Sequence, residues 1–110
     1  MQVTRLAVST FVILSSTYGL VVECAAQNII VNGGFEQGPS IPPGQTGLGV
    51  TGSAVPGWTI PFGNCDILSS FWSPSEGVRS LDLHGGIPGA IEQAVGTIAG
   101  ATYSVTFDMG

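Results

Sequence analysis

Positive charge is almost absent from this sequence. The chain has two Lys or Arg residues against seven Asp or Glu residues, and its formal net charge is −5. After residue 26 the only cation is Arg79, which is outnumbered by six carboxylates. A surface this acidic is repelled by phosphate backbones and by anionic lipid headgroups. The composition therefore argues against nucleic acid and against an anionic membrane surface as partners.

A hydrophobic run of membrane-spanning length is also missing. The apolar stretch at residues 6–22 is diluted by Ser and Thr, and it falls short of the roughly 20 apolar residues that a spanning helix needs. Arg5 precedes this stretch, and the small residues of Cys24–Ala26 follow it, as in a secretory signal. We therefore expect residues 1–26 to be a signal peptide. A membrane anchor is a weaker alternative, and so is a lipoprotein signal, because Glu23 stands where that signal needs a small residue.

Cysteine is scarce as well. Once the expected signal is removed, Cys65 is the only one. A single thiol in a secreted protein indicates either a free buried cysteine or a partner outside this sequence. The sequence ends in what reads as the middle of a strand-rich domain. We therefore expect residues 27–110 to be one domain that is incomplete at its C-terminus.

The motifs of common catalytic sites are missing too. There is no G-x-S-x-G elbow and no zinc-type spacing of Cys and His. His84, the only histidine, follows Asp82 by two residues and precedes a Gly pair, so we expect a turn residue there. Glycoside hydrolysis requires two carboxylates at a separation that only the fold determines, and Asp82 and Glu92 are the first pair to test. We expect a protein that is not an enzyme.

Short strand-like runs separated by Gly and Pro are what the sequence does contain. In the clearest run, Ala101–Met109, the side chains of Tyr103, Val105 and Phe107 alternate with polar ones, which indicates a half-buried strand. Weaker runs lie at residues 28–31, 57–60, 65–68, 78–83 and 90–95. Residues 37–55 lack periodicity and are expected to form a loop. This pattern predicts an all-β fold, an antiparallel sandwich or jelly roll.

Five short motifs occur in a fixed order. They are Asn32–Pro39, Pro56–Trp58, Ser80–Gly85, Ile91–Gln93 and Tyr103–Asp108. Together they resemble the domain-of-unknown-function 642 family, which includes plant cell-wall proteins and the bacterial secreted proteins called choice-of-anchor C. The resemblance covers nearly all of residues 27–110. It implies a galactose-binding-like β-sandwich, the architecture of many carbohydrate-binding modules, and it leaves the mode of anchoring open.

Glu36 is a candidate ligand for a structural calcium ion. In sandwich modules of this kind, an acid just after the first strand often helps to hold calcium, and Asp108 or a residue beyond Gly110 would be a second ligand. Calcium takes six to eight oxygen ligands, and the sequence has no compact Asp-x-Asp-x-Asp loop. The alternative is that Glu36 accepts backbone N–H bonds and fastens its loop. The sequence favours this alternative.

Two aromatic residues and one cation are candidates for glycan contacts. Trp58 enters a strand after a turn, so we expect it in the core rather than on a sugar. Trp72 lies among Ser, Pro and Gly, where an exposed ring would stack on a sugar; packing under a loop is an equal alternative. Arg79 is expected to pair with Glu76 or Asp82, or else to contact an acidic polysaccharide.

These observations predict a secreted, non-catalytic, carbohydrate-binding-like domain at a cell surface, in a cell wall or in extracellular matrix. The predicted partner is a glycan, and the predicted ligand-binding residues are Trp72 and Arg79. The first alternative is a structural or adhesive surface protein that binds other proteins. The second alternative is a glycoside hydrolase.

Overall fold

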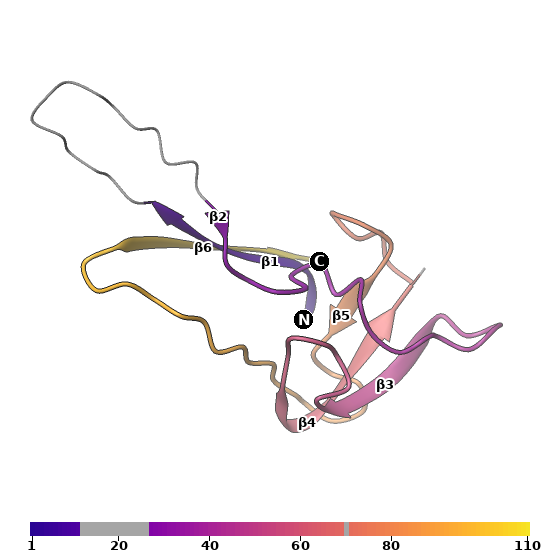
Figure 1. Ribbon diagram of the computed structural model, residues 1–110. Helices are drawn as coiled ribbons and strands as arrows, with labels where there is room; N and C mark the ends of the chain where they lie inside the picture. Colours follow the sequence, from indigo (N-terminus) through magenta and orange to yellow (C-terminus); the bar gives the residue numbers. More distant parts are fainter. Residues whose placement is uncertain (12–26, 70) are drawn as a thin grey trace, which may run out of the picture.

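The computed structural model of the chain is a single antiparallel sheet of six strands (Figure 1). The structure describes residues 1–11, 27–69 and 71–110. The strands are β1 (Gln2–Phe11), β2 (Gln27–Asn28), β3 (Gly47–Gly52), β4 (Ile60–Leu68), β5 (Ser80–Asp82) and β6 (Thr102–Met109). The described residues contain no helix, and therefore none that is long and apolar enough to cross a membrane. The prediction of an all-β fold is confirmed.

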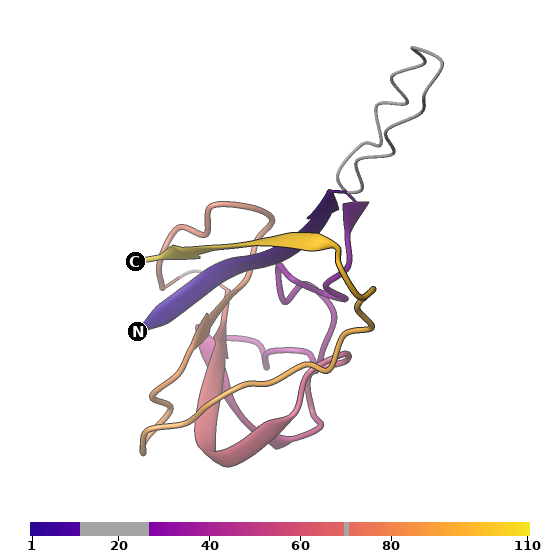
Figure 2. The same ribbon diagram turned by 90° about the vertical axis from the view of Figure 1, so that its left-hand side faces the viewer.

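The sheet has two parts that meet at β1. Strands β3, β4 and β5 follow one another in the sheet, and the N-terminal end of β1 pairs with β5 through Val3 and Leu81. Strand β6 pairs with β1 along nearly its whole length, from Val3 opposite Met109 to Phe11 opposite Thr102. Figures 1 and 2 both show β1 and β6 side by side, away from β3 and β4.

Strand β1 lies in the segment predicted to be a secretory signal. Its Val3 and Ala7 side chains are buried, and Leu6 packs against the hydrophobic core. Val and Leu are typical of an apolar signal, and Val and Thr favour a strand, so this segment suits both structures. The later part of the predicted signal, residues 12–26 with Cys24, lies outside the described residues. The signal peptide remains a prediction.

Strand β3 differs from what the sequence suggested. It lies within residues 37–55, which were expected to form a loop, and that expectation was wrong. Glycine is poorly represented in strands, so Gly47, Gly49 and Gly52 conceal the pattern. Val50 supplies the burial that the strand needs, with 4% of its surface exposed. Residues 90–95 show the opposite difference, because they contribute only an isolated bridge between Glu92 and Thr59.

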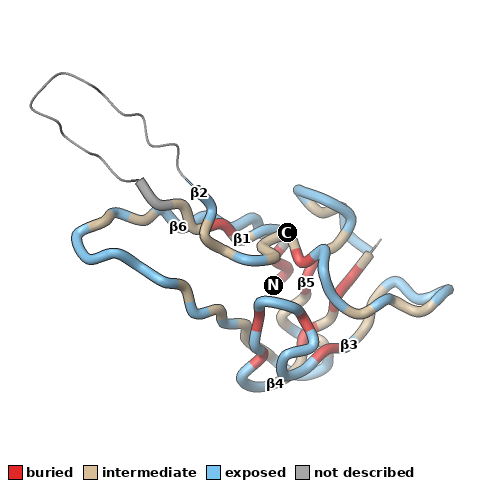
Figure 3. The backbone as a smooth tube through the Cα atoms, in the orientation of Figure 1, coloured by how far each residue is buried: buried red, intermediate tan, exposed pale blue. Residues whose placement is uncertain are grey.

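The core lies where β1, β4 and β5 meet, as the buried segments in Figure 3 show. Ile67 of β4 and Leu81 of β5 lie opposite each other and are both fully buried. Phe35 and Trp58 come from the loops and stack in a tilted pair, with ring centroids 5.5 Å apart. The core therefore joins loop residues to the middle of the sheet, whereas β6 contributes no buried side chain to it.

Candidate functional site

The Asn32 side chain closes a tight turn ahead of the core. Its Nδ2 donates hydrogen bonds to the carbonyls of Gln37 and Pro56, and its Oδ1 accepts one from the Gln37 amide. Its own carbonyl accepts a hydrogen bond of 2.9 Å from the Trp58 indole Nε1. Trp58 is 4% exposed, so the prediction of a core aromatic is confirmed. Asn32 has a φ of 53°, a left-handed conformation that Asn tolerates better than most residues.

The Gln93 side chain forms hydrogen bonds to the backbone like those that a neighbouring strand would form. Its Oε1 accepts a hydrogen bond of 2.8 Å from the Val31 amide, and its Nε2 donates one of 2.9 Å to the Val31 carbonyl. Nε2 also donates to the Gly57 carbonyl at 2.6 Å. One side-chain amide thus satisfies three backbone groups on two loops. The sequence placed Gln93 in a motif but gave no sign of this role.

Glu36 fastens the loop that precedes β5. Its Oε1 accepts hydrogen bonds of 2.9 Å from the amides of both Val78 and Arg79. Gly77 approaches this carboxylate so closely that a Cβ there would overlap it. The interpretation of Glu36 as an acceptor of backbone N–H bonds is therefore confirmed.

The calcium site remains a prediction. Asp108, its second predicted ligand, accepts a hydrogen bond of 2.8 Å from the Ser75 hydroxyl. Within residues 1–11, 27–69 and 71–110, no three His, Cys, Asp or Glu side chains gather as a metal site requires. Glu36 thus accepts two backbone N–H bonds and Asp108 accepts one bond from a loop hydroxyl.

The motifs therefore hold the fold together, and a binding site has to be sought elsewhere. A hollow of about 360 Å³ opens beside β3 and β4. It is lined by Thr46, Gly47, Gly49, Asp66, Leu68, Phe71, Trp72 and Asp82. Its volume is within the range of small-molecule sites. Because glycines have no side chain, Gly47 and Gly49 leave this part of the sheet surface open.

Trp72 and Phe71 form the aromatic wall of the hollow. Their rings meet edge to face, with centroids 4.7 Å apart. Trp72 is 41% exposed and Phe71 is 61% exposed. Of the two alternatives for Trp72, exposure is what the structure shows. Edge-to-face contact holds two rings in a defined geometry, which provides a surface for an apolar ligand face.

Asp66 and Asp82 form the polar side of the hollow. They lie directly opposite each other on β4 and β5. Burial raises the pKa of the Asp66 carboxyl, and the neighbouring Asp82 carboxylate raises it further. Asp82 Oδ1 accepts a hydrogen bond of 2.9 Å from the His84 amide, so His84 is the turn residue that the sequence predicted.

Asp66 was missed by sequence analysis. It follows Cys65 in one short run, and Asp82 belongs to another run. Only the pairing of β4 with β5 brings the two carboxylates together. The alternation within each run was the available signal, but the register between the runs could not be derived from it.

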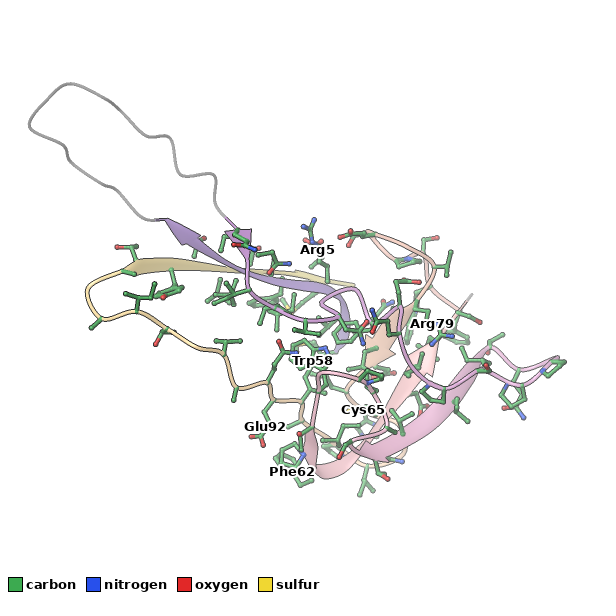
Figure 4. The ribbon with its side chains drawn as sticks, in the orientation of Figure 1. Arg5, Trp58, Phe62, Cys65, Arg79 and Glu92 are labelled. Atoms are coloured by element: carbon green, nitrogen blue, oxygen red, sulfur yellow. The ribbon has the colours of Figure 1, made fainter. Side chains whose placement is uncertain are left out.

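Arg79 lies apart from the hollow. Its guanidinium donates a hydrogen bond of 3.2 Å to the Pro39 carbonyl, and the side chain is half-buried (Figure 4). Glu76, one of its expected partners, pairs instead with Arg5 at 2.9 Å. The expected ion pair of Arg79 with Glu76 is therefore wrong, and Arg79 does not line the hollow that contains Trp72.

The first carboxylate pair proposed for hydrolysis is divided between two hollows. Asp82 lines the hollow with Trp72, whereas Glu92 lines another with Thr59 and Gln93. The Cys65 thiol is fully buried and free, as one of the two sequence interpretations required. Burial, followed by the charges of Asp66 and Asp82, raises the pKa of this thiol and keeps it protonated.

An apolar hollow of about 290 Å³ lies on the other part of the sheet, against β1 and β6. It is lined by Met1, Val3, Leu6, Leu83, Gly89, Ala90, Ile91 and Phe107. It adjoins a β6 whose Val105, Phe107 and Met109 side chains are all more than half exposed. The expectation that this face of the strand is buried was wrong, because no layer of the described chain covers it.

Comparison with known proteins identifies relatives. The family model described as "Protein of unknown function (DUF642)" matches residues 28–110. Halomucin of Haloquadratum walsbyi is 35% identical over 106 residues, covering 91% of this chain and 1% of halomucin. Two Arabidopsis thaliana proteins, DUF642 L-galactono-1,4-lactone-responsive gene 2 and gene 1, are 35% and 33% identical over 76% of this chain.

The chain spans about a quarter of the length of these plant relatives, since the matches cover 25% of each. No solved structure matches the chain. The family model extends over β3 to β6, their loops and the core residues outside β1, and so includes every motif that the hydrogen bonds above connect. The chain belongs to the DUF642 family of proteins of unknown function.

Proposed function

We propose that the chain is a secreted, non-catalytic domain that binds glycans at a cell surface, in a cell wall or in extracellular matrix. Its fold would be a galactose-binding-like jelly roll. The observation that carries the proposal is the exposed Trp72 ring beside a hollow with two carboxylates. A sugar ring has an apolar C–H face and a rim of hydroxyls. The aromatic wall matches the face, and the carboxylates of Asp66 and Asp82 accept hydrogen bonds from the rim.

Sugar binding of this type needs an accessible ring that is held in place. Phe71 supports Trp72 edge to face, so stacking would require little additional ordering of the side chain. The division of Asp82 and Glu92 between two hollows is an argument against hydrolysis by this pair. Hydrolysis requires two carboxyl groups on either side of one bond.

A polysaccharide depletion assay on the full chain tests the proposal. Wall and matrix glycans are offered with calcium and with a chelator, and the variant is Trp72→Ala. Phe62→Ala is the matched control, because Phe62 is an exposed aromatic on β4 that does not line the hollow. We expect Trp72→Ala to abolish binding and Phe62→Ala to preserve it. Binding that survives Trp72→Ala, or no binding to any glycan, would refute the proposal.

A structural or adhesive protein that binds other proteins is the second candidate. The exposed apolar face of β6 and the adjoining apolar hollow favour it. Extended apolar surface of this kind often marks protein contacts. Phe107→Lys separates the two candidates: protein capture would be lost with this substitution, whereas glycan depletion would be unchanged.

A further inference from the structure

The two carboxylates of the hollow are an unfavourable pair. Asp66 and Asp82 are direct cross-strand neighbours, and like charges in that position destabilise a sheet. Among the described residues, none donates a hydrogen bond to the Asp66 side chain, whereas Asp82 has the His84 amide. Burial raises the pKa of the Asp66 carboxyl, and repulsion by Asp82 raises it further; a ligand with positive charge between the two carboxylates would offset this repulsion.

Two glycines leave room for the Asp66 carboxylate. A Cβ on Gly85 would lie 2.5 Å from Asp66 Oδ1, and one on Gly49 would lie 3.4 Å from the same oxygen. Gly49 also lines the hollow. The carboxylate therefore lies in a space that larger residues would close, next to the surface that a ligand would occupy.

We propose that the hollow selects a glycan unit that carries a protonated amine. Trp72 stacks on the apolar face of the sugar ring, and the ammonium donates hydrogen bonds to Asp66 and Asp82. This inference rests on the proposed function. Charge-assisted hydrogen bonds are roughly twice as strong as neutral ones, so they give the amine its advantage over a hydroxyl.

The same geometry disfavours acidic sugars. Uronate units would bring a third negative charge to Asp66 and Asp82, in a chain whose net charge is −5. Arg79, the cation that the sequence offered for such sugars, is directed at the Pro39 carbonyl. The chemistry of the hollow therefore orders the ligands as amino sugar, neutral sugar and acidic sugar.

The test compares ligands that carry a protonated amine with ligands in which the amine is a neutral acetamide. Glucosamine oligomers and their N-acetylated counterparts of equal length are titrated into the full chain by calorimetry, at about pH 6, where an ordinary amine is protonated. We expect the glucosamine oligomer to bind about tenfold more tightly. Asp66→Asn and Asp82→Asn should each reduce this ratio, while Glu92→Gln should preserve it. Glu92→Gln removes the same charge from a different hollow, and so controls for net charge.

Each outcome decides between the hypotheses. Equal binding of both oligomers, lost in Trp72→Ala, would overturn the amine preference and leave the glycan-binding proposal in place. If Glu92→Gln lowers the affinity ratio as much as the Asn variants do, or if both Asn variants keep the ratio, the preference arises from the net negative charge of the chain. Either result would also overturn the proposed amine selectivity of the hollow. If no oligomer or other glycan binds, both proposals fail. Circular dichroism shows whether each variant is folded, and two independent Asn variants guard against the failure of one.

Discussion

The two parts of the sheet are built from similar alternating patterns but differ in burial. We call β3, β4 and β5 with their loops the packed region, and β1 with β6 the ladder. In the packed region, Ile67 and Leu81 are fully buried. In the ladder, Val105 and Phe107 of β6 are 61% and 52% exposed. Alternation thus defines which side chains share a face, but burial depends on whether another segment covers that face.

The two parts also differ in what holds them together. Side chains tie the packed region to its loops, as Asn32, Gln93 and Glu36 show. In the ladder, Val3 anchors β1 to the core, whereas β6 is held mainly by backbone pairing with β1. Substitutions should therefore have large effects in the packed region and small effects on β6.

Leu81→Ala should have the largest effect on stability. It removes a fully buried side chain from the core and leaves a cavity, so we expect a loss of about 3 kcal/mol. Phe107→Ala is the matched change in the ladder and should cost less than about 1 kcal/mol. Urea denaturation measures both. Equal losses of unfolding free energy would show that β6 is as well packed as the packed region, and would contradict the difference in burial between the two parts of the sheet.

Gln93→Ala should have the second-largest effect on stability. It leaves three backbone groups of Val31 and Gly57 without their partner, and we expect a loss of about 2 kcal/mol. Gln93→Glu retains an acceptor for the Val31 amide but loses both donated bonds, so it should be almost as harmful. Denaturation curves report the two losses. A neutral Gln93→Ala would mean that water replaces the side-chain amide without cost.

Glu36→Ala should destabilise by about 1 kcal/mol, because the carboxylate is exposed but accepts two amide hydrogen bonds. Glu36→Gln keeps an acceptor oxygen and should lose less. Thermal melts with and without a chelator are the measurement, and we expect the same decrease in both. A decrease that appears only in the presence of calcium would show that Glu36 acts through an ion instead.

Asp66→Asn should have the smallest effect and the opposite sign. Because the folded pKa of Asp66 is raised, the unfolded chain releases this proton first as the pH rises. The stability contributed by Asp66 is therefore full below its unfolded value, near 3.8, and is lost as the pH rises through the folded pKa. We expect a higher melting temperature for Asp66→Asn at neutral pH, and no gain in acid. A lower melting temperature at neutral pH would contradict this.

The local sequence pattern was sufficient to predict some features of the fold and of the candidate site. Strict alternation predicted β6 as a strand, and turn chemistry placed Trp58 in the core and His84 in a turn. The exposed position of Trp72 followed from its polar, Pro-containing surroundings as one of two alternatives. Each of these conclusions depends on a few neighbouring residues, which is the information that sequence periodicity contains.

Features that depend on pairing across the sheet could not be predicted in this way. Asp66 meets Asp82 only through the register of β4 and β5. Arg79 donates to a carbonyl of a distant loop, although acids lie closer in sequence. The glycines of β3 interrupt the alternation that would predict a strand, so the sequence does not indicate one there. The same glycines leave the surface of the candidate site uncovered.

Because the two tryptophans have different surroundings, the intrinsic fluorescence of the chain can distinguish them. Trp58 is buried away from water, so its fluorescence is emitted at shorter wavelength and is shielded from a soluble quencher such as acrylamide. Trp72 is open to water, and it supplies the longer-wavelength component that the quencher reaches. A ligand in the hollow would shield the second component alone, whereas unfolding would expose both. One emission spectrum can therefore report occupancy and folding separately, without a label.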